Sequence, residues 1–111
     1  MLSYEEAKLW YDEIREKAAK ITDEDLKGMY DDFLKSAVEY AKNRAAWSFM
    51  DWNGRREDGG SRSIKHNGFM AMLDAVCRNI GIDGVDRIMP DRKTKGDFAC
   101  YITLFLSLEQ R

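Results

Sequence analysis

The sequence predicts an all-α protein, and three observations support this fold class. Only one of the 111 residues is proline, so little interrupts helix formation. Strong helix formers such as alanine, leucine, methionine, glutamate and lysine are frequent. Apolar residues recur at helical spacing in four segments. We therefore expect one domain, residues 1–111, folded as an irregular four-helix antiparallel bundle with a long second helix and a short extra turn before the last helix.

The first helix is predicted over residues 3–20. Ser3 and Glu6 have the spacing of a capping box, in which each side chain accepts a hydrogen bond from the backbone of the other residue. Apolar residues then recur on one face, and charged residues occupy the opposite face. The apolar positions are Ala7, Trp10, Tyr11, Ile14, Ala18 and Ile21.

The second helix is predicted to run from residue 23 to residue 53, with Thr22 as its cap. Its apolar stripe begins at Leu26 and continues through Phe33 and Val38 to the tryptophans near its end. A straight helix of this length is about 45 Å long, whereas a compact domain of this size has a diameter of roughly 35 Å. We therefore expect the helix either to bend or to extend beyond its neighbours.

The end of this helix is apolar around almost its whole circumference. At about 100° per residue, Trp47, Phe49, Met50 and Trp52 point in four different directions. Such a helix end must be covered by its own chain or by a partner. The sequence therefore makes these four residues the candidate partner interface, for a homo-oligomer, such as a dimer, or for another protein. For Trp47 and Trp52 themselves, packing in the core beneath Trp10 and Tyr11 is the favoured interpretation, and a role as interface anchors is the alternative.

A loop and a third helix follow. The glycine-rich, charged segment 54–62 is predicted to be a loop. A helix is then expected from Ser61 or Ser63 to about Ile80, with Gly81 as the residue that ends it. Residues 83–89 are expected to form a short helical turn, which Pro90 closes.

The last helix is predicted over residues 94–110, with Thr94 and Asp97 as a capping box. Phe98, Tyr101, Ile102, Phe105 and Leu108 fit helical spacing, whereas Leu104 and Leu106 break the amphipathic pattern. Because the segment is apolar nearly all round, we expect it at the centre of the bundle. The apolar run 98–108 is too short to cross a membrane.

The charge is unevenly distributed along the chain. Residues 1–40 carry eleven acidic and six basic side chains, whereas residues 41–111 carry nine acidic and twelve basic ones. Two oppositely charged faces explain this distribution, and a basic surface for nucleic acid is the alternative. The candidate basic patch consists of Arg55, Arg56, Arg62, Lys65, Arg92, Lys93 and Lys95.

The residues with chemical reactivity are few. Cys77 and Cys100 lie in apolar helical patterns and are predicted to be buried thiols of a cytoplasmic protein. His66 is the only histidine, and a structural role is favoured over a catalytic pair with Cys100. The spacing of histidines, cysteines and carboxylates matches no metal site, and no phosphate-binding or nucleophile motif is present. We therefore predict neither catalytic residues, nor a metal, nor a cofactor.

Two stretches carry a resemblance to a known family. They are Arg62-Ser63-Ile64-Lys65-His66-Asn67-Gly68-Phe69 and Asp91-Arg92-Lys93-Thr94-Lys95-Gly96-Asp97-Phe98-Ala99-Cys100-Tyr101. Together they resemble a family of small proteins of Gram-positive gut and lactic bacteria, often encoded near mobile elements or phage genes and without an assigned activity. The resemblance covers roughly the C-terminal half. It implies a bacterial, cytoplasmic, mainly helical protein and identifies no functional residues.

The sequence thus favours a non-enzymatic protein-interaction or regulatory module. A nucleic-acid accessory protein that uses the basic patch is the alternative, and an enzyme built around His66 and Cys100 is the least favoured hypothesis. Glu5 and Glu6 interrupt any N-terminal apolar run, so we expect neither a signal peptide nor contact with a membrane.

Overall fold

The computed structural model describes the backbone of residues 2–50 and 59–110, and the side chains of residues 2–44 and 68–110. The described backbone is all-α and contains no strand, as predicted. The helices, in order, are α1 (Tyr4–Ala18), α2 (Glu24–Met50), α3 (Gly59–Ile80), the short α4 (Val85–Ile88) and α5 (Arg92–Glu109).

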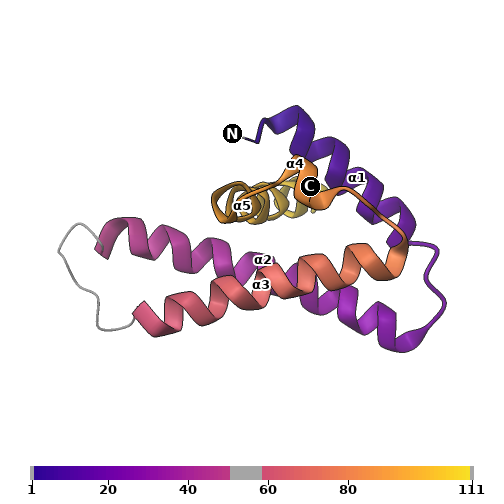
Figure 1. Ribbon diagram of the computed structural model, residues 1–111, viewed down its shortest axis with the longest axis horizontal. Helices are drawn as coiled ribbons and strands as arrows, with labels where there is room; N and C mark the ends of the chain where they lie inside the picture. The colour runs from indigo at the N-terminus through magenta and orange to yellow at the C-terminus, as the bar shows by residue number, and fades with distance from the viewer. Residues whose placement is uncertain (1, 51–58, 111) are drawn as a thin grey trace.

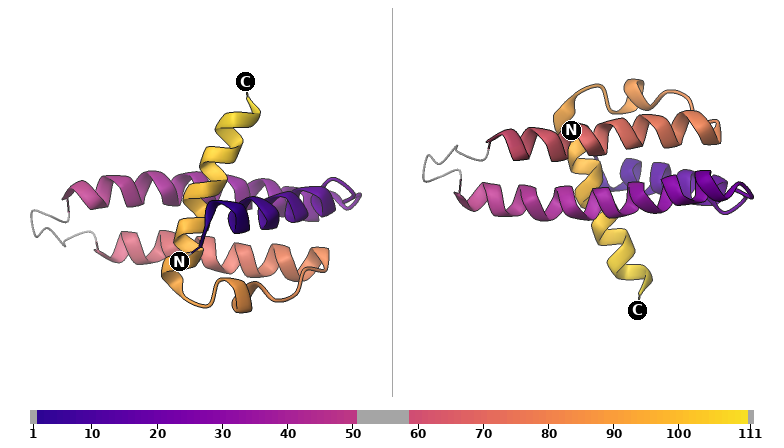
Figure 2. Two further views of the ribbon diagram at one scale, coloured as in Figure 1. Left: turned by 90° about the horizontal axis from the view of Figure 1, so that it is seen from above. Right: turned by 90° about the horizontal axis from the view of Figure 1, so that it is seen from below.

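The two longest helices, α2 and α3, lie side by side and antiparallel, and α5 crosses them (Figure 1, Figure 2). α1 lies on the other side of α5, so α5 contacts α1, α2 and α3. The predicted central position holds only in part: α5 contacts the three other long helices, as α3 does, but Leu104 and Leu108 on its outer side are each 43% exposed. The antiparallel arrangement holds for α2 and α3, while α5 runs across them.

The second helix is long, as predicted, and it is continuous over Glu24–Met50. Its 27 residues span about 40 Å, close to the 46 Å longest extent of the molecule. The sequence predicted that α2 either bends or extends beyond its neighbours. The first turns of α3 lie beside the last turns of α2, so these two helices extend together (Figure 1). Both project past the crossing of α5.

Aromatic side chains hold the α2–α3 pair together. The ring of Phe69 stacks on Phe33 and Tyr40 of α2, with centroid separations of 5.7 and 5.8 Å. Phe98, Ile102 and Phe105 of α5 are fully or almost fully buried against this pair and α1. The buried apolar residues form one cluster that reaches all five helices.

The helix starts confirm one predicted cap and correct three. Ser3 and Glu6 form the predicted capping box. At α2, the Asp23 carboxylate accepts a hydrogen bond from the Leu26 backbone, so Thr22 was the wrong cap. At α5, the Asp91 carboxylate accepts a hydrogen bond from the Thr94 backbone, and Asp97 instead pairs with α2.

α3 starts at Gly59, before the expected Ser61 or Ser63, so residues 59–62 are helical where a loop was predicted.

The end of α3 is as predicted. Gly81 has a φ of +83°, which favours glycine, and the backbone N–H of Ile82 bonds to the carbonyl of Cys77 at 2.8 Å. The short helix α4 then lies where the sequence predicted a turn, and its last residue is followed by Met89 and Pro90.

Gly96 permits the close crossing of α2 and α5. A Cβ atom at this position would lie 2.6 Å from the hydroxyl oxygen of Tyr40 and 3.1 Å from the guanidinium of Arg44. The side chain of Tyr40 is buried and its ring is rigid, so it cannot easily move aside. A side chain at position 96 would therefore separate the two helices.

Two glycine substitutions should consequently have opposite effects on stability. Gly96→Ala should lower the free energy of unfolding by about 1–3 kcal/mol, because it overpacks the crossing. Gly28→Ala, where nothing lies within 4 Å of the added Cβ, should raise it by about 0.5–1 kcal/mol. Urea unfolding measures both values, and a shift of the two variants in the same direction would contradict the close crossing.

Candidate interaction surface

The interface predicted from the sequence lies at the far end of α2. Trp47, Phe49 and Met50 belong to the last turns of this helix. Their side chains, and the whole of Trp52, lie outside the described residues. The candidate interface at these four residues therefore stays a prediction.

The predicted basic patch is described only in part. Arg55 and Arg56 lie outside the described residues, and Arg62 and Lys65 are described only as backbone of α3. The remaining three cations lie in the first turns of α5. Lys95 is paired with Asp86 at 2.8 Å, while Lys93 is exposed at the rim of a pocket and Arg92 is also exposed.

The two cysteines differ in exposure. Cys77 is buried, as predicted, whereas Cys100 is exposed, so the predicted burial of Cys100 is wrong. Cys100 faces outward because α5 buries the side that carries Phe98, Ile102 and Phe105, and position 100 lies on the opposite side. The side chain of His66 lies outside the described residues, so its pairing with Cys100 is untested.

The outward side of α5 carries no charge over three turns. All eleven residues of Phe98–Leu108 are uncharged, although 34% of the whole chain is charged. Leu104 and Leu108 are each 43% exposed on this side. Tyr4 of α1, also 43% exposed, continues the apolar area, because its ring packs edge-on against Tyr101 and Phe105. We call this surface the α5 face, and it consists of Tyr4, Cys100, Tyr101, Leu104 and Leu108.

A pocket of about 480 Å³ opens at the N-terminal side of the α5 face. Arg44 of α2 and Leu2, which precedes α1, both line it. The Tyr101 hydroxyl donates a hydrogen bond to the backbone carbonyl of Leu2 at 3.3 Å, which holds this segment against α5. The full lining is Leu2, Arg44, Lys93, Asp97, Cys100, Tyr101 and Leu104.

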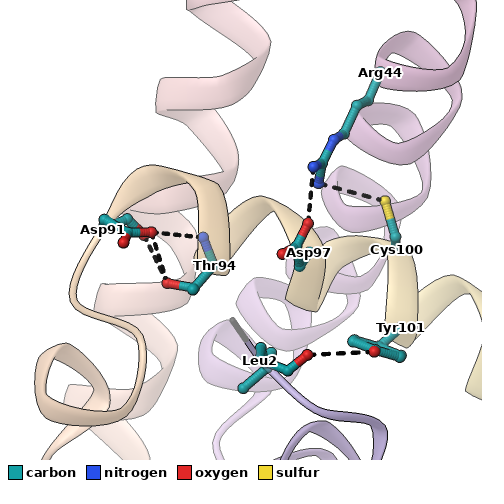
Figure 3. A network of polar contacts seen from close by, with 7 residues as sticks. All are labelled: Leu2, Arg44, Asp91, Thr94, Asp97, Cys100 and Tyr101. Atoms are coloured by element: carbon teal, nitrogen blue, oxygen red, sulfur yellow. Dashed lines mark hydrogen bonds and ion pairs between the residues drawn. The ribbon is translucent and has the colours of Figure 1, made fainter. Parts of the chain in front are cut away.

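Arg44 organises the polar end of the pocket. Its guanidinium lies 2.8 Å from an Asp97 carboxylate oxygen and donates a weaker contact to the Cys100 sulfur at 3.8 Å (Figure 3). Partial burial acts to lower the pKa of Arg44, but the hydrogen bond with Asp97 together with the electrostatic effects of Asp97, Cys100 and Tyr40 outweighs it, and the pKa lies above its usual value. The Arg44 guanidinium therefore stays charged over the ordinary pH range, and Lys93 is the remaining cation of the pocket lining.

A second groove lies on the other side of the α2–α5 crossing. It has a volume of about 600 Å³, and its apolar floor is formed by Leu34, Val38 and Leu106. Asp31, Lys35 and Glu39 of α2 line its rim. This groove is bordered by charges of both signs, unlike the central part of the α5 face.

Periodicity did not identify the α5 face. The spacing of Leu108 predicted a buried position, yet the residue is 43% exposed. The available signal is Leu104, which breaks the amphipathic pattern. Burial all round is the wrong interpretation of that break, because Leu104 is 43% exposed. The absence of charge over Phe98–Leu108 was visible in the sequence, but which part of it faces outward depends on the direction in which α5 crosses α2.

No protein-family model, curated protein or solved structure matches this chain. The resemblance of residues 62–69 and 91–101 to a bacterial family therefore stays a prediction. Among the described helices, none is both long and apolar enough to cross a bilayer. The described cysteine and carboxylate side chains form no group of three that could hold a metal ion.

The exposure of the two thiols predicts different reactivities. Burial, reinforced by the nearby charges of Asp74 and Glu13, raises the pKa of Cys77 to about 12. At pH 8 this thiol is protonated as well as covered, so we expect one alkylated cysteine per folded chain, at Cys100, and two after unfolding. Mass spectrometry of the labelled protein measures this, and Cys100→Ser serves as the control. Equal labelling of both thiols in the folded chain would contradict the packing of α3.

Proposed function

We propose that this protein is a non-enzymatic helical module that binds another protein chain, and that the α5 face is its binding surface. The observation that carries the proposal is the uncharged, partly exposed stretch of α5. Exposed leucines occur singly on most proteins, but here Leu104 and Leu108 lie one turn apart, next to the exposed ring of Tyr4. Such contiguous apolar areas mark interaction sites in soluble proteins.

The composition of the α5 face supports a protein partner. The cores of protein–protein interfaces are depleted of charge and enriched in aromatic side chains, and the α5 face has two tyrosines and no charged residue. Two of the ionic groups at its edge, Arg44 and Asp97, already neutralise each other. A nucleic-acid phosphate binds cationic side chains, but here Asp97 already neutralises Arg44. Binding of nucleic acid by the basic patch is therefore a weaker hypothesis than binding of a protein by the α5 face.

The location that fits this proposal is the cytoplasm. Cys77 and Cys100 are both free thiols, and an exposed thiol such as Cys100 persists most readily in a reducing compartment. The apolar end of α2, with Trp47 and Trp52, remains a separate candidate for a partner interface.

A photo-crosslinking side chain at position 104 tests the proposal. Introduced into the full chain in its native host, it should form defined products with another protein or with a second copy. The matched control is position 9, because Leu9 of α1 is even more exposed, at 67%, but does not belong to the α5 face. The same products at both positions, or products at neither, would contradict the proposal.

The partner captured at position 104 is then purified, and its affinity is measured for the wild-type chain and for three variants. Leu104→Lys should weaken binding at least about tenfold, since it places a charge in an apolar contact, whereas Leu9→Lys should leave the affinity unchanged. Equal binding by the wild type and Leu104→Lys would show that the α5 face is not the binding surface. Leu108→Lys provides a second substitution on the same face.

A further inference from the structure

We infer that the partner of the α5 face is a second copy of this chain. The two α5 helices would pack antiparallel about a twofold axis near Leu104, with Leu108 of each copy entering the pocket beside Cys100 and Tyr101 of the other. This inference rests on the proposed function and specifies its partner. The argument uses the shape of the surface, its charge and its extent.

The surface is self-complementary in shape about Leu104. Four residues before Leu104, about 6 Å along the helix, Cys100 lines the pocket. Four residues after it, Leu108 is exposed. The C-terminal part of α5 also extends beyond α2, so α2 does not cover it (Figure 2). A twofold axis at Leu104 brings position 100 of one copy opposite position 108 of the other, as a twofold interface requires.

The charge distribution favours the antiparallel direction. The first turns of α5 carry Lys93 and Lys95, and its last turn contains no basic residue and ends at Glu109. This order is the reverse of what a helix dipole favours, because an N-terminus is partly positive and a C-terminus partly negative. Antiparallel packing brings the partly negative C-terminal end of one helix toward Lys93 in the lining of the other pocket. Parallel packing would instead bring like charges together.

The extent of the surface predicts a weak dimer. A stable interface buries about 800 Å² on each partner, and the α5 face comprises five side chains and a pocket that is open to solvent. We therefore expect dissociation in the micromolar range, on the order of 10 µM or weaker, and a mass that depends on concentration. An obligate dimer would require a larger apolar area than this surface offers.

Disulfide trapping tests the geometry. In Leu108→Cys, the new thiol should lie opposite Cys100 of the second copy, within the roughly 7 Å between Cα atoms that a disulfide can bridge. Mild oxidation should then give a covalent dimer in high yield. Leu9→Cys should give no more dimer than the wild type, and the double variant Cys100→Ser/Leu108→Cys should lose the product. Failure of Leu108→Cys to crosslink, or persistence of the dimer without Cys100, would overturn the inferred packing.

Sedimentation equilibrium tests the association itself. The average mass of the wild-type chain should rise between about 5 and 500 µM, a range that spans the expected dissociation constant. Leu104→Lys should weaken the association at least about tenfold, whereas Leu9→Lys should leave it unchanged, with circular dichroism confirming that each variant folds. Leu108→Lys replaces Leu104→Lys if that variant is unfolded.

The two proposals fail in different ways. A wild-type chain that stays monomeric over the whole range overturns self-association. Crosslinking of position 104 to a different protein would then leave the proposed function standing, while the absence of any product at position 104 would overturn both.

Discussion

The close crossing of α2 and α5 at Gly96 is the contact on which the candidate surface depends. Because glycine has no side chain, Tyr40 and Arg44 can approach the backbone of α5 directly. This approach places the Arg44 guanidinium beside Asp97 and Cys100, where it forms a wall of the pocket. One missing Cβ atom thus determines both the spacing of the two helices and the shape of the surface at their junction.

The opposite side of α5 is fixed by α1. The Tyr11 hydroxyl donates a hydrogen bond to the carboxylate of Glu109, and Arg15 lies 3.3 Å from the same carboxylate. The rings of Tyr4 and Tyr11 pack against Phe105, so α1 contacts the C-terminal half of α5. With α1 on one side and α2 on another, the rotation of α5 about its own axis is settled. Leu104 and Leu108 are then the residues that remain exposed.

The fold class and most of the core followed from periodicity, because burial of one helix face is a local property of the sequence. The caps were harder to predict. Asp23 and Asp91 each lie close to a threonine that can also cap, and the choice depends on where the backbone enters the helix. The outward position of Cys100 depends on the direction of the α2–α5 crossing, which no local pattern specifies. The same long-range contact brings Arg44 to Asp97, 53 positions apart in the sequence.

The placement of apolar area on α5 separates folding from association. Phe98, Ile102 and Phe105 are buried in the single chain, so their contribution to stability is already realised when the chain folds. Leu104 and Leu108 keep much of their surface in water, and that area can contribute free energy only when another molecule covers it. A polar residue at either position would lower the stability of the folded monomer little, and it would reduce the tendency of this surface to bind other molecules. Leucine at both positions, next to Tyr4 and within an uncharged stretch, is therefore better explained by association than by folding of the single chain.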